Sequence, residues 1–204
     1  MVSTTMVYNK YRNAFEQKCF RLIIEAYQVS LSEKVIQLDW NENDISYELY
    51  EKIEANTARI KKYKIHISTE FRISKNVAKI KGFADKLPRI DLKMSNFALE
   101  QEFKYLFEAK NLKENDSKLK RRYIKTGIDS FINGKYPYGF LIGYLLEGTV
   151  TSTIEEGVNK LLRKDKRDNE CLEPKDHKIV EHYYESCHSK LILKHLILDF
   201  TVLP

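Results

Sequence analysis

Apolar residues recur at steps of three and four along four segments of the chain, which is the pattern of helices with one buried face. Asn43 or Asp44 can cap the exposed amides at the start of the second segment, and Asn133-Gly134 ends the third. The positions between the apolar ones are mostly polar or charged. The pattern predicts helices over residues 8–29, 44–62, 117–133 and 151–162.

Other segments have the period of strands or are apolar throughout. Ile65, Ile67, Thr69 and Phe71 alternate with polar residues, whereas residues 138–146 are almost continuously apolar, as expected for a strand buried on both faces. A charged loop is expected over residues 163–176. The predicted strands are residues 64–73, 89–94, 103–109, 138–146 and 189–200.

These elements predict an α/β fold in which helices flank a central mixed sheet. The order is helix, three strands, helix, strand over residues 42–146, preceded by an extra helix at 8–30 and followed by a helix and strand within 150–204. A length of 204 residues suits one domain with helical additions, and the residues after the charged loop are too few for a second core.

The charge balance is compatible with a polyanionic partner. The chain has 35 Lys and Arg against 29 Asp and Glu, a net charge of +6. Basic residues gather after position 110, where they either follow a phosphate backbone or form a solvated helix face. The candidates for nucleic-acid contact are Lys113, Lys118, Lys120, Arg121, Arg122 and Lys125.

Cysteine usage and hydropathy indicate a reducing cytoplasm and no membrane residence. The sequence has three widely spaced cysteines, no signal segment and no apolar run long enough to cross a bilayer. Zinc-type ligands gather near the C-terminus, but they contain no Cys-x-x-Cys pair, so we expect neither zinc nor a disulfide. This group is Cys171, His177, His182, Cys187 and His188, while His195 is expected to be a hydrogen-bonded core histidine.

Acidic-x-Lys triplets are frequent in this chain, and context must select among them. Only Glu108-Ala109-Lys110 ends a strand-like apolar run, so residues 108 and 110 share one face. Asp91 starts another short strand 108 − 91 = 17 residues earlier, which is enough for a turn and a returning strand. Two adjacent carboxylates favour a hard cation such as Mg²⁺ or Mn²⁺. The other triplets are Glu16-Gln17-Lys18, Asp91-Leu92-Lys93, Asp116-Ser117-Lys118 and Glu173-Pro174-Lys175.

A cation at this position suits phosphodiester hydrolysis, which needs charge relief on the phosphate and help for the leaving oxygen. An alternative register combines Glu70 with Asp91-Leu92-Lys93, since 91 − 70 = 21 residues is also feasible. It ranks lower because residues 89–94 are a weaker central strand than residues 103–109. The chain has no Gly-rich phosphate loop and no Gly-x-Ser-x-Gly motif, so nucleotide hydrolysis and serine-hydrolase chemistry have no support.

The element order, with Pro88-Arg89-Ile90-Asp91 and Phe107-Glu108-Ala109-Lys110, resembles the PD-(D/E)xK superfamily over about residues 42–146. The resemblance implies a restriction-endonuclease-like core. It also implies that Asp91 and Glu108 are metal ligands, that the Ala109 carbonyl is a further ligand, and that Lys110 is catalytic. Members often add an acid from the first helix, for which Glu42 is our choice. The chain departs from the motif at Ile90, which stands where the family has proline.

The resulting expectation is an Mg²⁺-dependent endonuclease acting on DNA rather than RNA, with a role in bacterial or phage-related genome defence. A homodimer or a partner protein in a defence complex is compatible with it. The alternative is a non-catalytic nucleic-acid-binding or complex-forming protein that keeps the nuclease fold. A single-site mutant series assayed for activity with metal separates the two.

Overall fold

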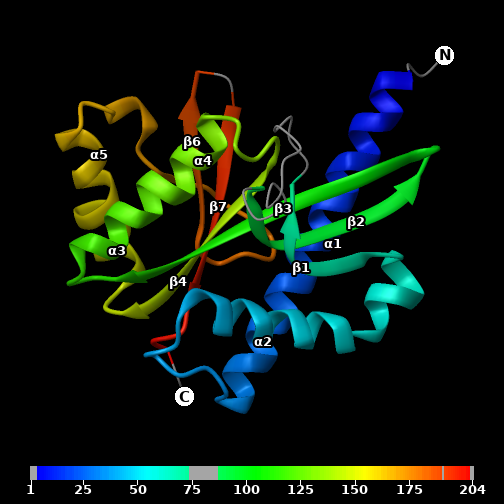
Figure 1. Ribbon diagram of the computed structural model, residues 1–204, viewed down its shortest axis with the longest axis horizontal. Helices are drawn as coiled ribbons and strands as arrows, with labels where there is room; N and C mark the ends of the chain where they lie inside the picture. Colours follow the sequence, from blue (N-terminus) through cyan, green and yellow to red (C-terminus); the bar gives the residue numbers. More distant parts are fainter. Residues whose placement is uncertain (1–3, 74–86, 190, 203–204) are drawn as a thin grey trace, which may run out of the picture.

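The computed structural model describes residues 4–73, 87–189 and 191–202, and Figure 1 shows their arrangement. Within them, seven strands form one mixed sheet in the order β1-β2-β3-β4-β7-β6-β5. The meander β1-β2-β3 is antiparallel, whereas β3, β4 and β7 are parallel neighbours. The strands are β1 (His66–Arg72), β2 (Arg89–Ala98), β3 (Gln101–Lys113), β4 (Gly139–Glu147), β5 (Glu173–Pro174), β6 (Tyr183–His188) and β7 (Leu191–Asp199).

Helices flank this sheet, which confirms the predicted α/β class with a central mixed sheet. The predicted helix over residues 117–133 is confirmed as three consecutive helical segments, ended by Asn133 and by Gly134 with φ of +64°. The helices are α1 (Thr4–Glu33), α2 (Glu42–Ala55), η1 (Arg59–Tyr63), α3 (Ser117–Arg122), η3 (Tyr123–Ile128), α4 (Asp129–Ile132), η4 (Ser152–Asn159), α5 (Lys160–Lys164) and η5 (Asp168–Glu170).

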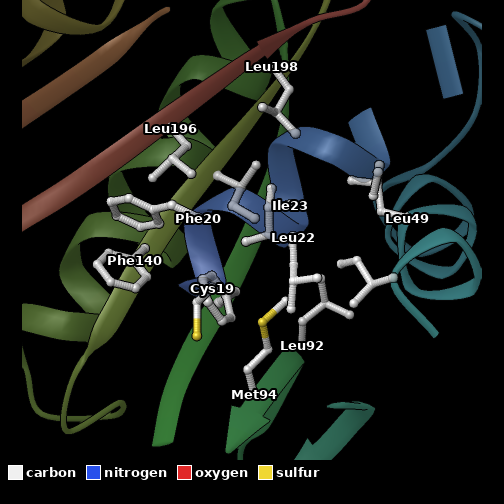
Figure 2. Packing of buried hydrophobic residues seen from close by; sticks show 14 of the residues in the cluster. Cys19, Phe20, Leu22, Ile23, Leu49, Leu92, Met94, Phe140, Leu196 and Leu198 are labelled. Carbon is white, nitrogen blue, oxygen red and sulfur yellow. The ribbon is translucent and has the colours of Figure 1, made fainter. Parts of the chain in front are cut away.

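Helices α1 and α2 cover one face of the sheet. Figure 2 shows Phe20, Ile23 and Leu49 from these helices packed toward strand residues such as Leu92 and Phe140. All five side chains are at most 1% exposed. Burial of large side chains at roughly 25 cal/mol per Å² of apolar area stabilises this layer.

A second core lies on the opposite face, under α3, η3, α4, η4 and α5. Leu141 and Leu145 of β4 belong to it, while Phe140 and Tyr144 of the same strand belong to the first core. The predicted burial of residues 138–146 on both faces is therefore confirmed. Period-two alternation between two helical layers explains why this strand is apolar throughout.

The start of α2 differs from the prediction by two residues. Asn41, not Asn43 or Asp44, is the N-cap: its Oδ1 accepts hydrogen bonds from Asn43 N at 2.9 Å and Asp44 N at 3.1 Å. Asp44 Oδ2 accepts in return from Asn41 N at 3.4 Å, which completes a capping box. The helix consequently begins at Glu42 and ends at Ala55, before a separate π-helical turn.

Strand predictions in three regions are wrong in extent or number. The strand expected over residues 89–94 continues to Ala98 as β2. The strand expected to end at Ala109 continues to Lys113, where Asn111 pairs with Tyr144 of β4 despite its polar side chain. The C-terminal region adds three strands rather than one: β5 falls in the predicted charged loop at residues 163–176, and β6 was not predicted. Since β7 pairs with β4, this region continues the same sheet.

In the part of the chain that the structure describes, none of the helices is both long and apolar enough to span a membrane.

Candidate functional site

Asp91 lies where three strands of the meander depart from regular pairing. The β2–β3 ladder ends at Leu92 opposite Phe107, and Asp91 Oδ2 instead accepts a 2.6 Å hydrogen bond from Ala109 N. On the other side, the β1–β2 ladder omits a pair between Glu70 and Asp91, and Glu70 has φ of +45°. Because backbone pairing is interrupted at Asp91, its side chain accepts the hydrogen bond from the Ala109 N–H of β3.

Glu108 and Lys110 lie together on β3, as their spacing predicts. Lys110 Nζ donates to Glu108 Oε1 at 2.7 Å and to Ala109 O at 2.6 Å. Both residues are nearly buried, with 6% and 5% exposed. The predicted proximity of Asp91, Glu108 and Lys110 is confirmed, because Asp91 and Lys110 both bond to atoms of the segment 108–109.

Glu42, at the first position of α2, joins this group. Its Oε1 accepts a 3.1 Å hydrogen bond from Asn111 N, and its Oε2 lies 2.9 Å from Arg122 Nη2 and 3.8 Å from Lys110 Nζ. The Asn41 capping box places Glu42 at this point, since it fixes where the first helical turn begins. We call Glu42, Asp91, Glu108, Lys110 and Arg122 the carboxylate cluster.

The carboxylate cluster has more negative than positive charge. It contains three carboxylates against the two cations Lys110 and Arg122, and 3 − 2 = 1. Burial, followed by the neighbouring charge of Glu108, raises the pKa of Asp91 to about 7. Glu108 Oε2 is buried and has no donor in good hydrogen-bonding geometry, although the Tyr136 hydroxyl lies near enough for Glu108 to raise the pKa of Tyr136. Burying a carboxylate oxygen without a donor, next to a second carboxylate, costs free energy of folding unless a further cation neutralises the pair.

A metal at this point would depend on two carboxylates. No group of three or more His, Cys, Asp or Glu side chains is arranged to hold a metal ion anywhere in the described ranges. The ligands available are Asp91 and the free Oε2 of Glu108. The Ala109 carbonyl, expected as a further ligand, accepts from Lys110, although a carbonyl oxygen has a second lone pair. The donor set is oxygen only, which fits Mg²⁺ or Mn²⁺ with water in the remaining positions.

A pocket of about 310 Å³ gives access to Asp91 from outside. It lies between the start of α2 and strand β1, where Thr69 and Glu70 form the opposite wall. Of the carboxylate cluster, Asp91 is thus partly buried and reachable from outside. The lining residues are Asn43, Asp44, Ser46, Tyr47, Thr69, Glu70 and Asp91.

The alternative site, in which Glu70 acts with Asp91 and Lys93, does not form in the structure. Lys93, which would be its lysine, pairs instead with Glu102 at 2.8 Å. The Glu70 side chain is 64% exposed and lies 4.0 Å from Arg89. Glu70 lines the pocket beside Asp91 without Lys93, so the structure favours Glu108 and Lys110 as the partners of Asp91.

The predicted basic residues divide into two groups. Lys120 donates to Glu114 O at 2.5 Å, Arg121 pairs with Asp165, and Lys125 lies 3.6 Å from Asp129. Lys118 is exposed and Lys113 is half-buried, while Arg122 belongs to the carboxylate cluster with 54% of its side chain exposed. The helix therefore presents fewer free cations than its sequence suggests.

His188 and His195 near the C-terminus contact protein side chains. His195 is fully buried, and its two ring nitrogens lie 2.8 Å from Tyr123 OH and from Ser186 Oγ, which confirms the predicted core histidine. His188 Nδ1 lies 2.8 Å from Glu170 Oε2. All three cysteines, Cys19, Cys171 and Cys187, are free thiols.

The sequence did not single out two residues beside the cluster. Asn111 is 8% exposed, donates to Trp40 O at 2.9 Å, and leaves its Oδ1 unpartnered. Tyr136 is 1% exposed and donates to Arg89 O at 2.9 Å. Burial, with the nearby charge of Glu108, raises the pKa of Tyr136. The only available signal for Asn111 was a polar residue within an apolar strand.

A scan of protein-family models and searches of curated proteins and of solved structures find no match to this chain.

Proposed function

We propose that this protein is a metal-dependent nuclease of the restriction-endonuclease-like, PD-(D/E)xK kind that hydrolyses phosphodiester bonds in DNA. One observation carries the proposal: Asp91 is held against the strand that carries the buried carboxylate of Glu108, so closely that the charge of Glu108 helps to raise the pKa of Asp91. The sheet order β1-β2-β3-β4, with a helix before β1 and another between β3 and β4, supports it.

Asp91 and Glu108 would hold the cation, because Asp91 pairs with neither Lys110 nor Arg122 and only one oxygen of Glu108 is bonded to Lys110. A bound Mg²⁺ or Mn²⁺ supplies charge relief for the scissile phosphate and the leaving oxygen. The raised pKa of Asp91 is the expected state of a site built around a cation, since like charges at close range favour protonation in its absence.

Lys110 is the catalytic cation of the chain itself. Its ammonium group donates to Glu108 Oε1 at 2.7 Å and to Ala109 O at 2.6 Å, and it forms an ion pair with Glu42 Oε2 at 3.8 Å. A preorganised donor of this kind orients the attacking water or stabilises the charge that develops on the phosphate. Glu42 fixes the position of Lys110 and ties it to Arg122 on the surface.

Arg122 is the residue that would first contact the substrate. Its side chain is 54% exposed, and one of its nitrogens bonds to Glu42. A guanidinium has five N–H donors, so it can hold Glu42 and a phosphate together. Lys118, one turn earlier and exposed, extends this basic surface.

A cleavage assay on closed circular DNA tests the proposal, because only an internal cut converts a circle to a linear or nicked form. Double-stranded circles, single-stranded circles and RNA are incubated with Mg²⁺, Mn²⁺ or a chelator. We expect metal-dependent cutting of DNA by the native protein and at least a roughly hundredfold loss in Glu108→Gln, which keeps size but removes the charge. Equal rates in both proteins would refute the assignment; binding without cutting would favour the non-catalytic alternative.

A further inference from the structure

A second hollow lies apart from the carboxylate cluster, between the N-terminal half of α1 and the start of β4. In Figure 1 this half of α1 passes beside the β2–β3 hairpin, and Tyr8 and Phe103 there have ring centroids 5.0 Å apart. Two adjoining pockets of about 350 Å³ and 100 Å³ share Arg12, Tyr105 and Tyr138 as lining residues. We call this hollow, with Tyr8 at one end, the tyrosine groove.

Arg12 is held between aromatic rings rather than by an acid. Its guanidinium carbon lies 5.9 Å from the centroid of Tyr105 and 6.0 Å from that of Tyr138. The nearby carboxylate of Glu16 is already used, since Lys194 Nζ lies at 2.6 Å and Tyr105 OH donates at 3.1 Å. Among the described residues, Arg12 has no carboxylate within ion-pair distance; a hydrogen bond to Tyr105 and the charge of Glu16 raise its pKa, and its guanidinium lines both pockets of the tyrosine groove.

The groove also presents flat apolar surface. Tyr8 and Tyr138 are half-buried, which leaves part of each ring open to a ligand. A planar ring can stack on tyrosine, and a phosphate can bind a guanidinium in a bidentate manner. The aromatic faces fit the base of a nucleotide, and a guanidinium that no carboxylate pairs within ion-pair distance fits its phosphate.

We propose that the tyrosine groove binds single-stranded DNA, with bases stacked on Tyr8 and Tyr138 and the backbone phosphate on Arg12. The inference rests on the proposed nuclease function and names its substrate class. A duplex keeps its base faces stacked inside the helix, so it cannot offer them to these rings, whereas an unpaired strand can.

The position of the groove connects it to the carboxylate cluster. Gly139 of β4 pairs with Leu106 of β3, so its neighbour Tyr138 lies near Leu106. Leu106 is two residues before Glu108, which is about 7 Å along the strand. Tyr136 donates to Arg89 O, just before Asp91 on β2. The segment 136–139 therefore forms a wall of the groove and also contacts the strands that carry Asp91 and Glu108.

The test measures binding in the Glu108→Gln background by fluorescence anisotropy, with a labelled oligothymidylate, the same strand in a duplex, and thymidine monophosphate as competitor. Tyr138→Ala and Arg12→Ala should each weaken binding of the single strand by about five- to a hundredfold. Tyr138→Phe keeps the ring and should retain affinity. Arg21→Ala, which removes an exposed cation from the same helix, is the matched charge control and should bind normally.

Unchanged single-strand affinity in both Tyr138→Ala and Arg12→Ala would overturn the inference, and so would equal losses on single strand and duplex. Competition by the free mononucleotide at concentrations like those of the strand would also overturn it, since the groove would then be a nucleotide pocket. The two proposals fail separately. If the groove variants weaken binding but the native protein shows no metal-dependent cutting, the nuclease proposal fails and the groove proposal stands. If the protein with native Glu108 cuts DNA and no groove variant alters its rate, only the groove proposal fails.

Discussion

Ala109 N donates a 2.6 Å hydrogen bond to Asp91 Oδ2, which joins β2 to β3 through a side chain where the backbone ladder has stopped. This bond fixes the Asp91 carboxylate one residue from Glu108 and one from Lys110 along β3. It also places a charge in a buried position, where its stability depends on what neutralises it.

Asp91→Asn should stabilise the protein in the absence of metal. The folded pKa of Asp91 is about 7, above the unfolded value of 3.8, so the native state binds more protons. The ionised side chain opposes folding fully above about pH 7 and progressively less down to about pH 4. We expect urea unfolding with chelator to show a gain of about 1–3 kcal/mol at pH 8 that vanishes near pH 4. Glu70→Gln, an exposed acid in the same pocket, is the control; an identical pH profile in Asp91→Asn and native protein would contradict the account.

Lys110→Met should separate metal binding from turnover. The substitution removes the ammonium group but leaves Asp91 and Glu108 Oε2 intact, so affinity for Mn²⁺ by calorimetry should be kept or increased. Cleavage under single-turnover conditions should fall by about 10²- to 10⁴-fold. Lys160→Met, on the exposed surface of α5, is the matched control. Native turnover in Lys110→Met would show that this lysine has no catalytic role.

Glu42→Ala should destabilise the fold by about 1–3 kcal/mol, because the buried Asn111 N–H loses its acceptor and Lys110 loses a carboxylate. Glu42→Gln retains an acceptor oxygen and should recover much of the stability while still lowering activity. Urea unfolding and cleavage assays on the two variants test this. Equal stability of Glu42→Ala and native protein would place Glu42 outside the network.

Ser46 and Tyr144 connect α2 to β4 through a buried 2.9 Å hydrogen bond between their hydroxyl oxygens. Ser46→Ala leaves the Tyr144 hydroxyl buried without a partner, and we expect a loss of about 1–3 kcal/mol. Tyr144→Phe alone leaves the Ser46 hydroxyl buried without a partner. The double variant should be less destabilised than the sum of the single ones, as measured by urea unfolding. Simple additivity would mean that the two hydroxyls do not interact.

Much of the fold was predictable because its elements have clear periods. Residues 138–146 are apolar since helices cover both faces of β4, and Glu108 and Lys110 share a side because β3 is extended. Strand β6 was missed because Ser186 is polar yet fully buried, bonded to His188 of the same strand and to His195 of β7. Such tertiary partners leave no periodic signal.

The sequence predicted the three central residues of the site but not the hydrogen bonds that hold Glu42 beside them. Asp91, Glu108 and Lys110 follow from strand order and spacing. The Asn41 cap was misplaced by two residues because three of the four residues 41–44, namely Asn41, Asn43 and Asp44, have capping side chains. The bond from Asn111 N to Glu42 joins residues 69 positions apart, and no local pattern specifies it.

The central claim is that Asp91 and Glu108 share one divalent cation, and crystals of the native protein soaked in Mn²⁺ test it most directly. Anomalous scattering locates manganese independently of any assumption about its ligands. The account predicts a single strong peak within coordination distance of Asp91 and of Glu108 Oε2, which is absent in crystals of Glu108→Gln treated identically. Manganese bound only elsewhere, or an unchanged peak in Glu108→Gln, would contradict the claim.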